Sequence, residues 1–144
     1  MTASSPAAKG VLDTSTVILL PSISDASALP EQPLITAVTL AELSVGPLVA
    51  SDRRERAARQ AQLQQDEADF DPLPFDADAA RAFGRVAACL RRSGRKSSAR
   101  SYDAMIAATA LANGLALYTC NPDDFRGIDE LSVITVPVPA DRPS

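Results

Sequence analysis

Short apolar segments alternate along this chain with longer helix-forming segments, and that order limits the possible folds more than any other feature. The apolar segments span residues 10–13, 33–36, 115–119 and 132–136. Strands that alternate with helices pair in parallel, because each helix carries the chain back to the end of the sheet where the previous strand began. The sequence therefore predicts an α/β layered domain with a central parallel sheet.

The stretches between these segments carry recognisable signals of helix ends. The hydroxyls of residues 14–16 are predicted to cap the first helix, and Thr39 is predicted to cap the second, which ends at Gly46-Pro47. Residues 76–92 show the clearest amphipathic pattern, with apolar side chains three and four positions apart. The predicted helices span residues 17–20, 39–45, 51–67, 76–92 and 101–113.

A chain of 144 residues suits one domain. Residues 1–9 are expected to form a flexible lead-in, residues 10–138 the folded domain, and residues 139–144 a flexible tail. No apolar run approaches the roughly 20 residues that span a bilayer, and the lead-in does not resemble a secretory signal. The two cysteines lack a metal-binding spacing, so we expect a protein of the reducing cytoplasm with no membrane association.

The chain contains no histidine. This excludes a histidine general base, the Ser-His-Asp and Cys-His nucleophiles, and the zinc sites that use histidine. Catalysis by this chain would therefore depend on carboxylates, hydroxyls, amines or a metal held by oxygen ligands.

Several acidic residues are placed where they could share one site. Asp13 ends the first predicted strand, and Asp124, or its neighbour Asp123, follows a later strand. Glu42 and Asp103 are predicted to lie in the first turns of their helices. Ligands of parallel α/β sheets bind beyond the carboxyl ends of the strands, where these acids would repel one another. Mg²⁺ or Mn²⁺ would relieve that repulsion, and both prefer oxygen ligands.

Each acid also has a purely structural interpretation. Asp13 could cap a helix, and Glu42 could form a salt bridge or face solvent. Asp103 could serve only to complement a helix dipole, while Asp123 and Asp124 could be ordinary turn residues. None of these positions is decisive alone, so the prediction of a metal site depends on their joint pattern.

The net charge is −4, yet the cations are unevenly distributed. Residues 81–100 carry arginine and lysine but no acid, so this stretch is either a solvated face or a surface that binds phosphate. The candidate RNA-binding residues are Arg91, Arg92, Arg95, Lys96 and Arg100.

Together these motifs resemble the PIN-domain family, and within it the VapC-type toxins of bacterial toxin–antitoxin pairs. Residues 11–15 (Val-Leu-Asp-Thr-Ser) are similar to the opening strand and first acid of the family, and residues 39–43 (Thr-Leu-Ala-Glu-Leu) to its second acidic motif. The most specific match is residues 100–110 followed by residues 117–125, which resemble an Asp-x-x-Ile-Ala-Ala-x-Ala helix and a Thr-x-Asn-x-x-Asp-Phe loop. The resemblance covers roughly residues 10–138.

The resemblance implies a three-layer α/β/α fold and an endoribonuclease that depends on Mg²⁺ or Mn²⁺ and leaves a 5′-phosphate and a 3′-hydroxyl. It also implies a homodimer that a cognate VapB-type antitoxin holds inactive. By position, the principal metal ligands are Asp13 and Asp103, the acids that complete the cluster are Glu42 and Asp124, and the supporting polar residues are Ser15, Thr119 and Asn121.

Two other functions stay open at this point. The chain could be a PIN-like module that binds RNA or a protein without cutting, although it retains all the acids. It could also be a nuclease or phosphatase that acts on DNA or on small phosphoesters. The sequence does not identify the RNA target, which could be a tRNA, a ribosomal RNA or a messenger RNA.

Overall fold

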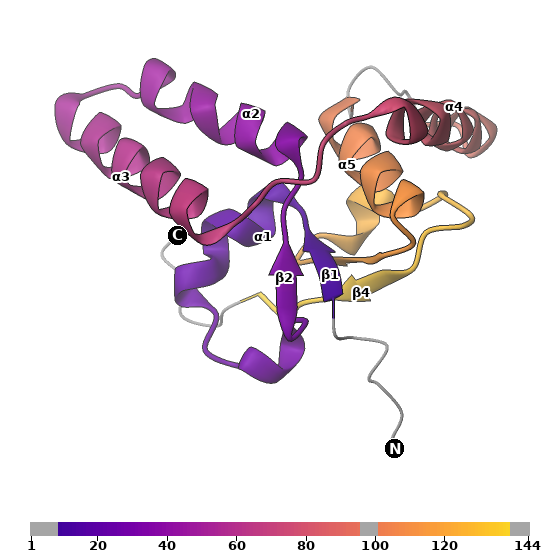
Figure 1. The fold of residues 1–144 in the computed structure, drawn as a ribbon, viewed down its shortest axis with the longest axis horizontal. Coiled ribbons are helices and arrows are strands. Elements are labelled where there is room, and N and C mark those ends of the chain that lie inside the picture. Colours follow the sequence, from indigo (N-terminus) through magenta and orange to yellow (C-terminus); the bar gives the residue numbers. More distant parts are fainter. Residues whose placement is uncertain (1–8, 96–100, 139–144) are drawn as a thin grey trace.

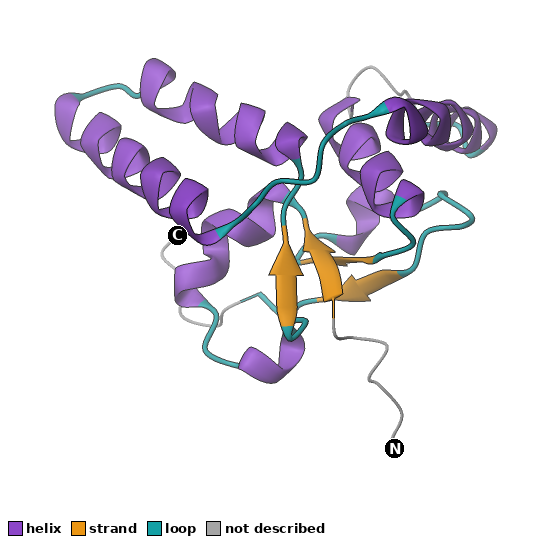
Figure 2. Cartoon of the chain, in the orientation of Figure 1, coloured by secondary structure: helices purple, strands orange, loops and turns teal. Residues whose placement is uncertain are grey.

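A four-stranded, wholly parallel sheet forms the centre of the molecule (Figures 1 and 2). The computed structural model describes residues 9–95 and 101–138. The strand order is β2-β1-β3-β4, with β1 at Lys9–Leu12, β2 at Gln32–Leu34, β3 at Ala116–Thr119 and β4 at Val133–Thr135. The predicted parallel sheet is confirmed. Lys9 belongs to β1 rather than to the lead-in, and the rest of the lead-in and the tail lie outside the described residues.

The two faces of the sheet bury different side chains, because successive residues of a strand point to opposite sides. Val11 and Leu117 pack with α4 (Ala77–Arg92) and α5 (Ser101–Ala112). Leu12 and Tyr118 belong to the core cluster on the other face, which includes Val17 of α1 (Thr14–Leu19). Helices therefore cover both faces of the sheet, which confirms the three-layer α/β/α architecture.

Two helices begin earlier than the sequence indicates. Asp13, not the hydroxyls of residues 14–16, is the N-cap of α1, since its side chain accepts a hydrogen bond from the amide of Thr16. Thr36, not Thr39, caps α2 (Ala37–Val45) by accepting from the amide of Thr39 at 3.1 Å. The hydroxyl caps predicted at residues 14–16 and at Thr39 were wrong, whereas the alternative that Asp13 caps a helix is confirmed. Several adjacent residues can cap, and the extended backbone at residues 13 and 36 selects among them.

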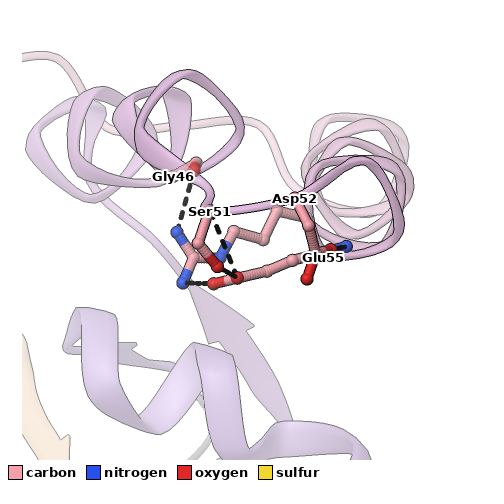
Figure 3. A network of polar contacts seen from close by, with 5 residues as sticks. Gly46, Ser51, Asp52 and Glu55 are labelled. Carbon is pink, nitrogen blue, oxygen red and sulfur yellow. Dashed lines mark hydrogen bonds and ion pairs between the residues drawn. The ribbon is translucent and has the colours of Figure 1, made fainter.

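The helices α2 and α3 (Arg53–Asp69), joined by the short helix η3 (Gly46–Val49), form an arm beside the sheet (Figure 1). A polar network holds the turn of this arm (Figure 3). The Arg59 guanidinium donates to the carbonyl of Gly46 at 2.9 Å and pairs with Glu55. The Ser51 hydroxyl also donates to Glu55, at 2.6 Å. These contacts fix the direction in which α3 leaves η3.

The helix α5 is lined with small residues that let α4 approach closely. Ala104, Ala107 and Ala108 are almost completely buried against the core that α4 shares. Asp76 caps α4 by accepting from the amide of Ala79 at 3.0 Å, and Gly114 follows α5 with a φ of 65°, as a glycine C-cap requires. None of the helices in the described residues has the length and apolar composition needed to cross a membrane.

Asp66 is a buried acid in α3 that has only part of its hydrogen-bonding capacity satisfied. Its side chain is 3% exposed, and Gln62 donates to Oδ1 at 3.0 Å. Its Oδ2 has no hydrogen-bond partner among the described residues. Burial raises the pKa of Asp66 above its ordinary value of 3.8, the hydrogen bond from Gln62 opposes the rise, and the charge of Asp69 adds to it. The ionised form of Asp66 therefore destabilises the fold.

Replacing this acid is expected to stabilise the protein. Asp66→Ala should raise the free energy of unfolding at pH 7 by about 1 kcal/mol, because it removes an incompletely paired buried charge. The folded-state pKa lies above the unfolded value, so the penalty exists at neutral pH. It should disappear as the pH falls towards 3.8, the unfolded value, where both states are protonated. Urea unfolding from pH 7 to pH 3.5 measures this, with Glu67→Ala as the control, because Glu67 is an exposed acid on the same helix. A gain that does not depend on pH would contradict the explanation.

Candidate functional site

The strands β1 and β3 are neighbours from which the chain leaves in opposite directions. The chain passes from β1 through α1 to β2 on one side, and from β3 through the short helix η5 (Pro122–Phe125) to β4 on the other. Ligands of open α/β sheets bind at such a switch point, beyond the carboxyl ends of the strands. Asp13 directly follows β1, and Thr119 is the last residue of β3. The strand order thus brings these two residues to the same place.

The Asp13 carboxylate is buried and held by donors on both oxygens. It is 2% exposed. Its Oδ1 accepts from the amide of Thr16 at 3.2 Å and from the Thr16 hydroxyl. Its Oδ2 accepts from the hydroxyl of Thr119 at 2.8 Å and from that of Ser15 at 3.2 Å. A buried carboxylate needs such partners, and these also fix the plane of the group.

Further hydrogen bonds surround these donors and join α1 to the chain after β3. The amide of Cys120 donates to the Thr16 hydroxyl of α1 at 3.0 Å. At the end of β3, the amide of Asn121 donates to the Thr119 hydroxyl at 2.9 Å. The side-chain amide of Asn121 donates to the Ser15 hydroxyl at 3.0 Å. The structure therefore brings Ser15, Thr119 and Asn121 around Asp13. Sequence reasoning missed Thr16 as a partner of Asp13, although a hydroxyl three residues after a capping acid was the available signal.

Glu42 lies near Asp13, in the second turn of α2 rather than the first, because the helix begins at Ala37. The hydroxyl of Thr14 donates to Oε1 of Glu42 at 2.5 Å. Burial raises the pKa of Glu42, the hydrogen bond from Thr14 opposes this rise, and the negative charge of Asp13 adds to it. The two carboxylates are thus electrostatically coupled.

Asp103 and Asp124 belong to two elements that pack against each other. Asp103 is half-buried in the first turn of α5, and Asp124 is half-buried in η5. Its neighbour Asp123 is exposed and pairs with Arg126 at 3.6 Å. Within residues 9–95 and 101–138, no three acidic or cysteine side chains are arranged so that they could hold a metal ion. The structure brings Asp13 and Glu42 together, and the four-residue cluster stays a prediction.

The donors present at the site suit a hard divalent cation. Asp13, Glu42 and the nearby hydroxyls offer only oxygen ligands. Mg²⁺ typically takes one or two carboxylates from a protein and fills its remaining positions with water and substrate oxygens. A cation between the coupled carboxylates would also remove the repulsion that helps raise the pKa of Glu42. The residues therefore fit Mg²⁺ or Mn²⁺.

A pocket of about 400 Å³ opens beside Glu42, between α1, α2 and α3. Its walls combine apolar side chains with the acid and with one arginine. The lining residues are Thr14, Ile18, Glu42, Leu43, Gly46, Arg59, Gln62 and Leu63. The second acid of the site is therefore reachable from this side of the molecule.

The candidate RNA-binding cations differ in their contacts. Arg92 pairs with Asp129 at 3.6 Å, and Arg95 donates to the carbonyl of Arg126 at 2.9 Å. Arg91 is exposed and makes no ion pair or side-chain hydrogen bond with any other described residue. Lys96 and Arg100 lie outside the described residues. Arg92 and Arg95 thus help hold the end of α4 against the loop after η5.

Comparison with known proteins places most of the described residues in one family. The PIN domain family model matches residues 11–131. Ribonuclease VapC5 of Mycobacterium tuberculosis is 40% identical over 131 residues, which are 90% of this chain and 94% of that protein. Ribonuclease VapC4 of the same organism is 35% identical over 71% of this chain and 75% of the relative.

Solved structures give the same result. The crystal structure of VapBC-5 from Mycobacterium tuberculosis, a member of the VapBC family of toxin–antitoxin systems, matches with a TM-score of 0.77 and 42% identity over 91% of this chain and 99% of the other. DNA-bound VapBC from Salmonella typhimurium matches with a TM-score of 0.72 and 26% identity over 88% of this chain and 97% of the other. Both solved structures therefore match this chain over about nine tenths of its length.

Proposed function

We propose that this chain, which belongs to the PIN-domain family, is a VapC-type endoribonuclease that cleaves RNA with the help of Mg²⁺ or Mn²⁺. The observation that carries the proposal is the buried Asp13 carboxylate, held by four donors at the switch point and coupled to Glu42. The name of the 40% identical relative, a ribonuclease, supports RNA as the substrate.

The residues of the site have distinct roles in this proposal. Asp13 and Glu42 would hold the cation, and Asp103 and Asp124 are proposed to complete the cluster. When bound, a divalent cation supplies charge stabilisation for a phosphodiester and makes water a better nucleophile. Thr119 and Ser15 keep the Asp13 carboxylate in one orientation through their hydroxyls. This set of roles needs no histidine, in agreement with the composition.

A digestion of RNA and DNA with matched sequences tests the proposal. The purified protein should cut the RNA at internal positions when Mg²⁺ or Mn²⁺ is present, leaving a 5′-phosphate, and should not cut after EDTA treatment. Cleavage of DNA alone would support the alternative of a DNA nuclease. Binding of RNA without cleavage at any metal concentration would support the non-cutting module instead.

The arginines of α4 are proposed to contact RNA phosphates, and Arg91 is the best placed of them. Arg91→Ala should weaken RNA binding for all sequences to a similar degree, and it should flatten the slope of log affinity against log salt by about one unit. The matched change Arg95→Ala should affect the slope less, because Arg95 already donates to the Arg126 carbonyl. Filter binding at KCl concentrations from about 50 to about 300 mM, which bracket physiological salt, would measure the slopes of both variants. An unchanged slope for Arg91→Ala would assign it to the solvated face.

We further propose that the arm binds an antitoxin of the VapB type, and that the toxin forms a homodimer. The arm exposes large apolar side chains, with Val45 49%, Leu48 80% and Val49 66% exposed. Beside them lies a pocket of about 430 Å³ that is lined by Pro47, Leu48, Arg53, Arg56, Ala57 and Gln60. Exposed apolar patches of this kind mark protein interfaces, and the similar structure from Mycobacterium tuberculosis is a member of the VapBC family of toxin–antitoxin systems.

Leu48→Asp tests the antitoxin surface. Because Leu48 is 80% exposed, the change should leave the fold and RNA cleavage intact. It should weaken binding of the co-purified antitoxin by at least about 10-fold, as loss of a central apolar contact does. Val138→Asp, a second exposed apolar position at 45% exposure, is the matched control. An isothermal titration in which Leu48→Asp and Val138→Asp both bind the antitoxin as tightly as the wild type does would place the antitoxin elsewhere.

A further inference from the structure

The hydroxyl of Thr14 lies between two groups that α2 contributes. Its Oγ1 is 2.5 Å from Oε1 of Glu42, to which it donates, and 3.0 Å from Oγ1 of Thr39. A hydroxyl has a single proton, so Thr14 cannot donate to both neighbours. The proton between Thr14 and Thr39 must therefore come from Thr39, which is fully buried. The three side chains form one directed chain that ends on the carboxylate.

Glu42 depends on this chain for its orientation. Within residues 9–95 and 101–138, Thr14 donates the only hydrogen bond that the Glu42 side chain receives. Asp13, by contrast, has donors on both oxygens. A long, half-buried glutamate with one hydrogen bond samples several rotamers when that bond is lost.

The position of Thr14 links the two acids directly. Thr14 follows Asp13 in the chain and is the first residue of α1, so its place is fixed by the same turn that Asp13 caps. The helix α1 packs against α2 at this point, and both Thr14 and Glu42 line the wall of the same pocket. Thr14 therefore connects the two acids, through its peptide bond to Asp13 and through its hydrogen bond to Glu42.

From this geometry we propose that Thr14 is the residue that positions Glu42 toward Asp13, with Thr39 supporting it from behind. This inference rests on the proposed function, because the two acids matter together only if they share a cation. The role belongs to the hydroxyl and not to the methyl group of Thr14. We therefore expect the Thr14 hydroxyl to be needed for metal affinity, even though Thr14 itself is not a metal ligand.

The test uses Mn²⁺ binding, measured by electron paramagnetic resonance on the purified full-length protein, together with RNA cleavage. Thr14→Val keeps the shape of the side chain and removes the donor, and it should weaken Mn²⁺ binding by about 10-fold or more, as loss of an outer-shell partner does. Thr14→Ser should restore binding to near the wild-type value. Thr39→Val should show a smaller loss, since it acts through Thr14. Thr109→Val is the control, because the Thr109 hydroxyl donates within α5 to the Met105 carbonyl and touches no acid of the site.

The outcomes separate this inference from the proposed function. Equal Mn²⁺ affinity in Thr14→Val and the wild type would overturn it, as would a Thr14→Ser variant as weak as Thr14→Val. A wild-type protein that binds no Mn²⁺ would refute the metal part of the proposed function instead. In that case, crystal structures of the wild type and Thr14→Val decide the inference: an unchanged Glu42 rotamer overturns it, and a displaced carboxylate supports it.

Discussion

Asp13→Asn should reduce RNA cleavage by at least about 100-fold, since loss of an outer-shell partner already costs up to that much and a direct ligand contributes more. The asparagine keeps one oxygen, which can accept the hydrogen bonds of Thr16. Its NH₂ group then faces the hydroxyls of Thr119 and Ser15, which donate to the carboxylate in the native site. The variant loses the negative charge that a cation needs, and its hydroxyl network must rearrange.

Rates of cleavage at several Mg²⁺ concentrations, with thermal unfolding of the same samples, measure this effect. The fold should survive with a cost of about 1–3 kcal/mol, typical of one disturbed buried hydrogen-bonding group. Asp123→Asn is the control, because Asp123 is exposed and pairs with Arg126. If Asp13→Asn kept a tenth of the wild-type rate, the carboxylate would not be a metal ligand.

Asp103→Asn should lower the cleavage rate by a similar factor. Asp103 is half-buried in the first turn of α5, and α5 packs against η5, which carries Asp124. A third carboxylate contributes directly to the charge that holds a divalent ion. The expected loss is therefore catalytic and not structural.

The fold provides a matched control for Asp103. Asp78 also lies in the first turn of its helix, α4, but it is exposed and pairs with Arg81 at 2.8 Å. Both substitutions remove a favourable interaction with a helix dipole, so if Asp103 served only to complement the dipole, Asp103→Asn would slow cleavage as little as Asp78→Asn. Single-turnover cleavage that is normal in Asp103→Asn and lost in Asp13→Asn would remove Asp103 from the proposed site.

Much of the fold could be predicted from local patterns. Parallel pairing followed from the alternation of strands with helices, and the amphipathic spacing of residues 76–92 identified α4 almost to the residue. Asp13 could be placed because its strand is short and apolar and ends at the acid. These features depend on residues close in sequence, which is why they can be read without a structure.

The contacts inside the site depend on residues far apart in the chain. In the sequence, Thr16 is one of many threonines, and its contact with Cys120 forms only when β3 pairs with β1. The contact of Thr14 with Glu42 likewise forms only when α2 packs on α1. Arg92 and Arg95 likewise appeared as part of a uniform basic run, but they contact the loop after η5. Hydroxyls and arginines are common on surfaces, so only tertiary packing distinguishes those with a specific role.

In the proposed function, Asp13 and Glu42, which lie on different elements, hold one divalent cation. A crystal soaked in Mn²⁺ and measured at the manganese absorption edge tests this directly. We expect an anomalous peak within ligand distance of both carboxylates, about 2.0–2.3 Å as oxygen ligands of such ions require. Strong manganese peaks elsewhere on the molecule and none between these two carboxylates would contradict it.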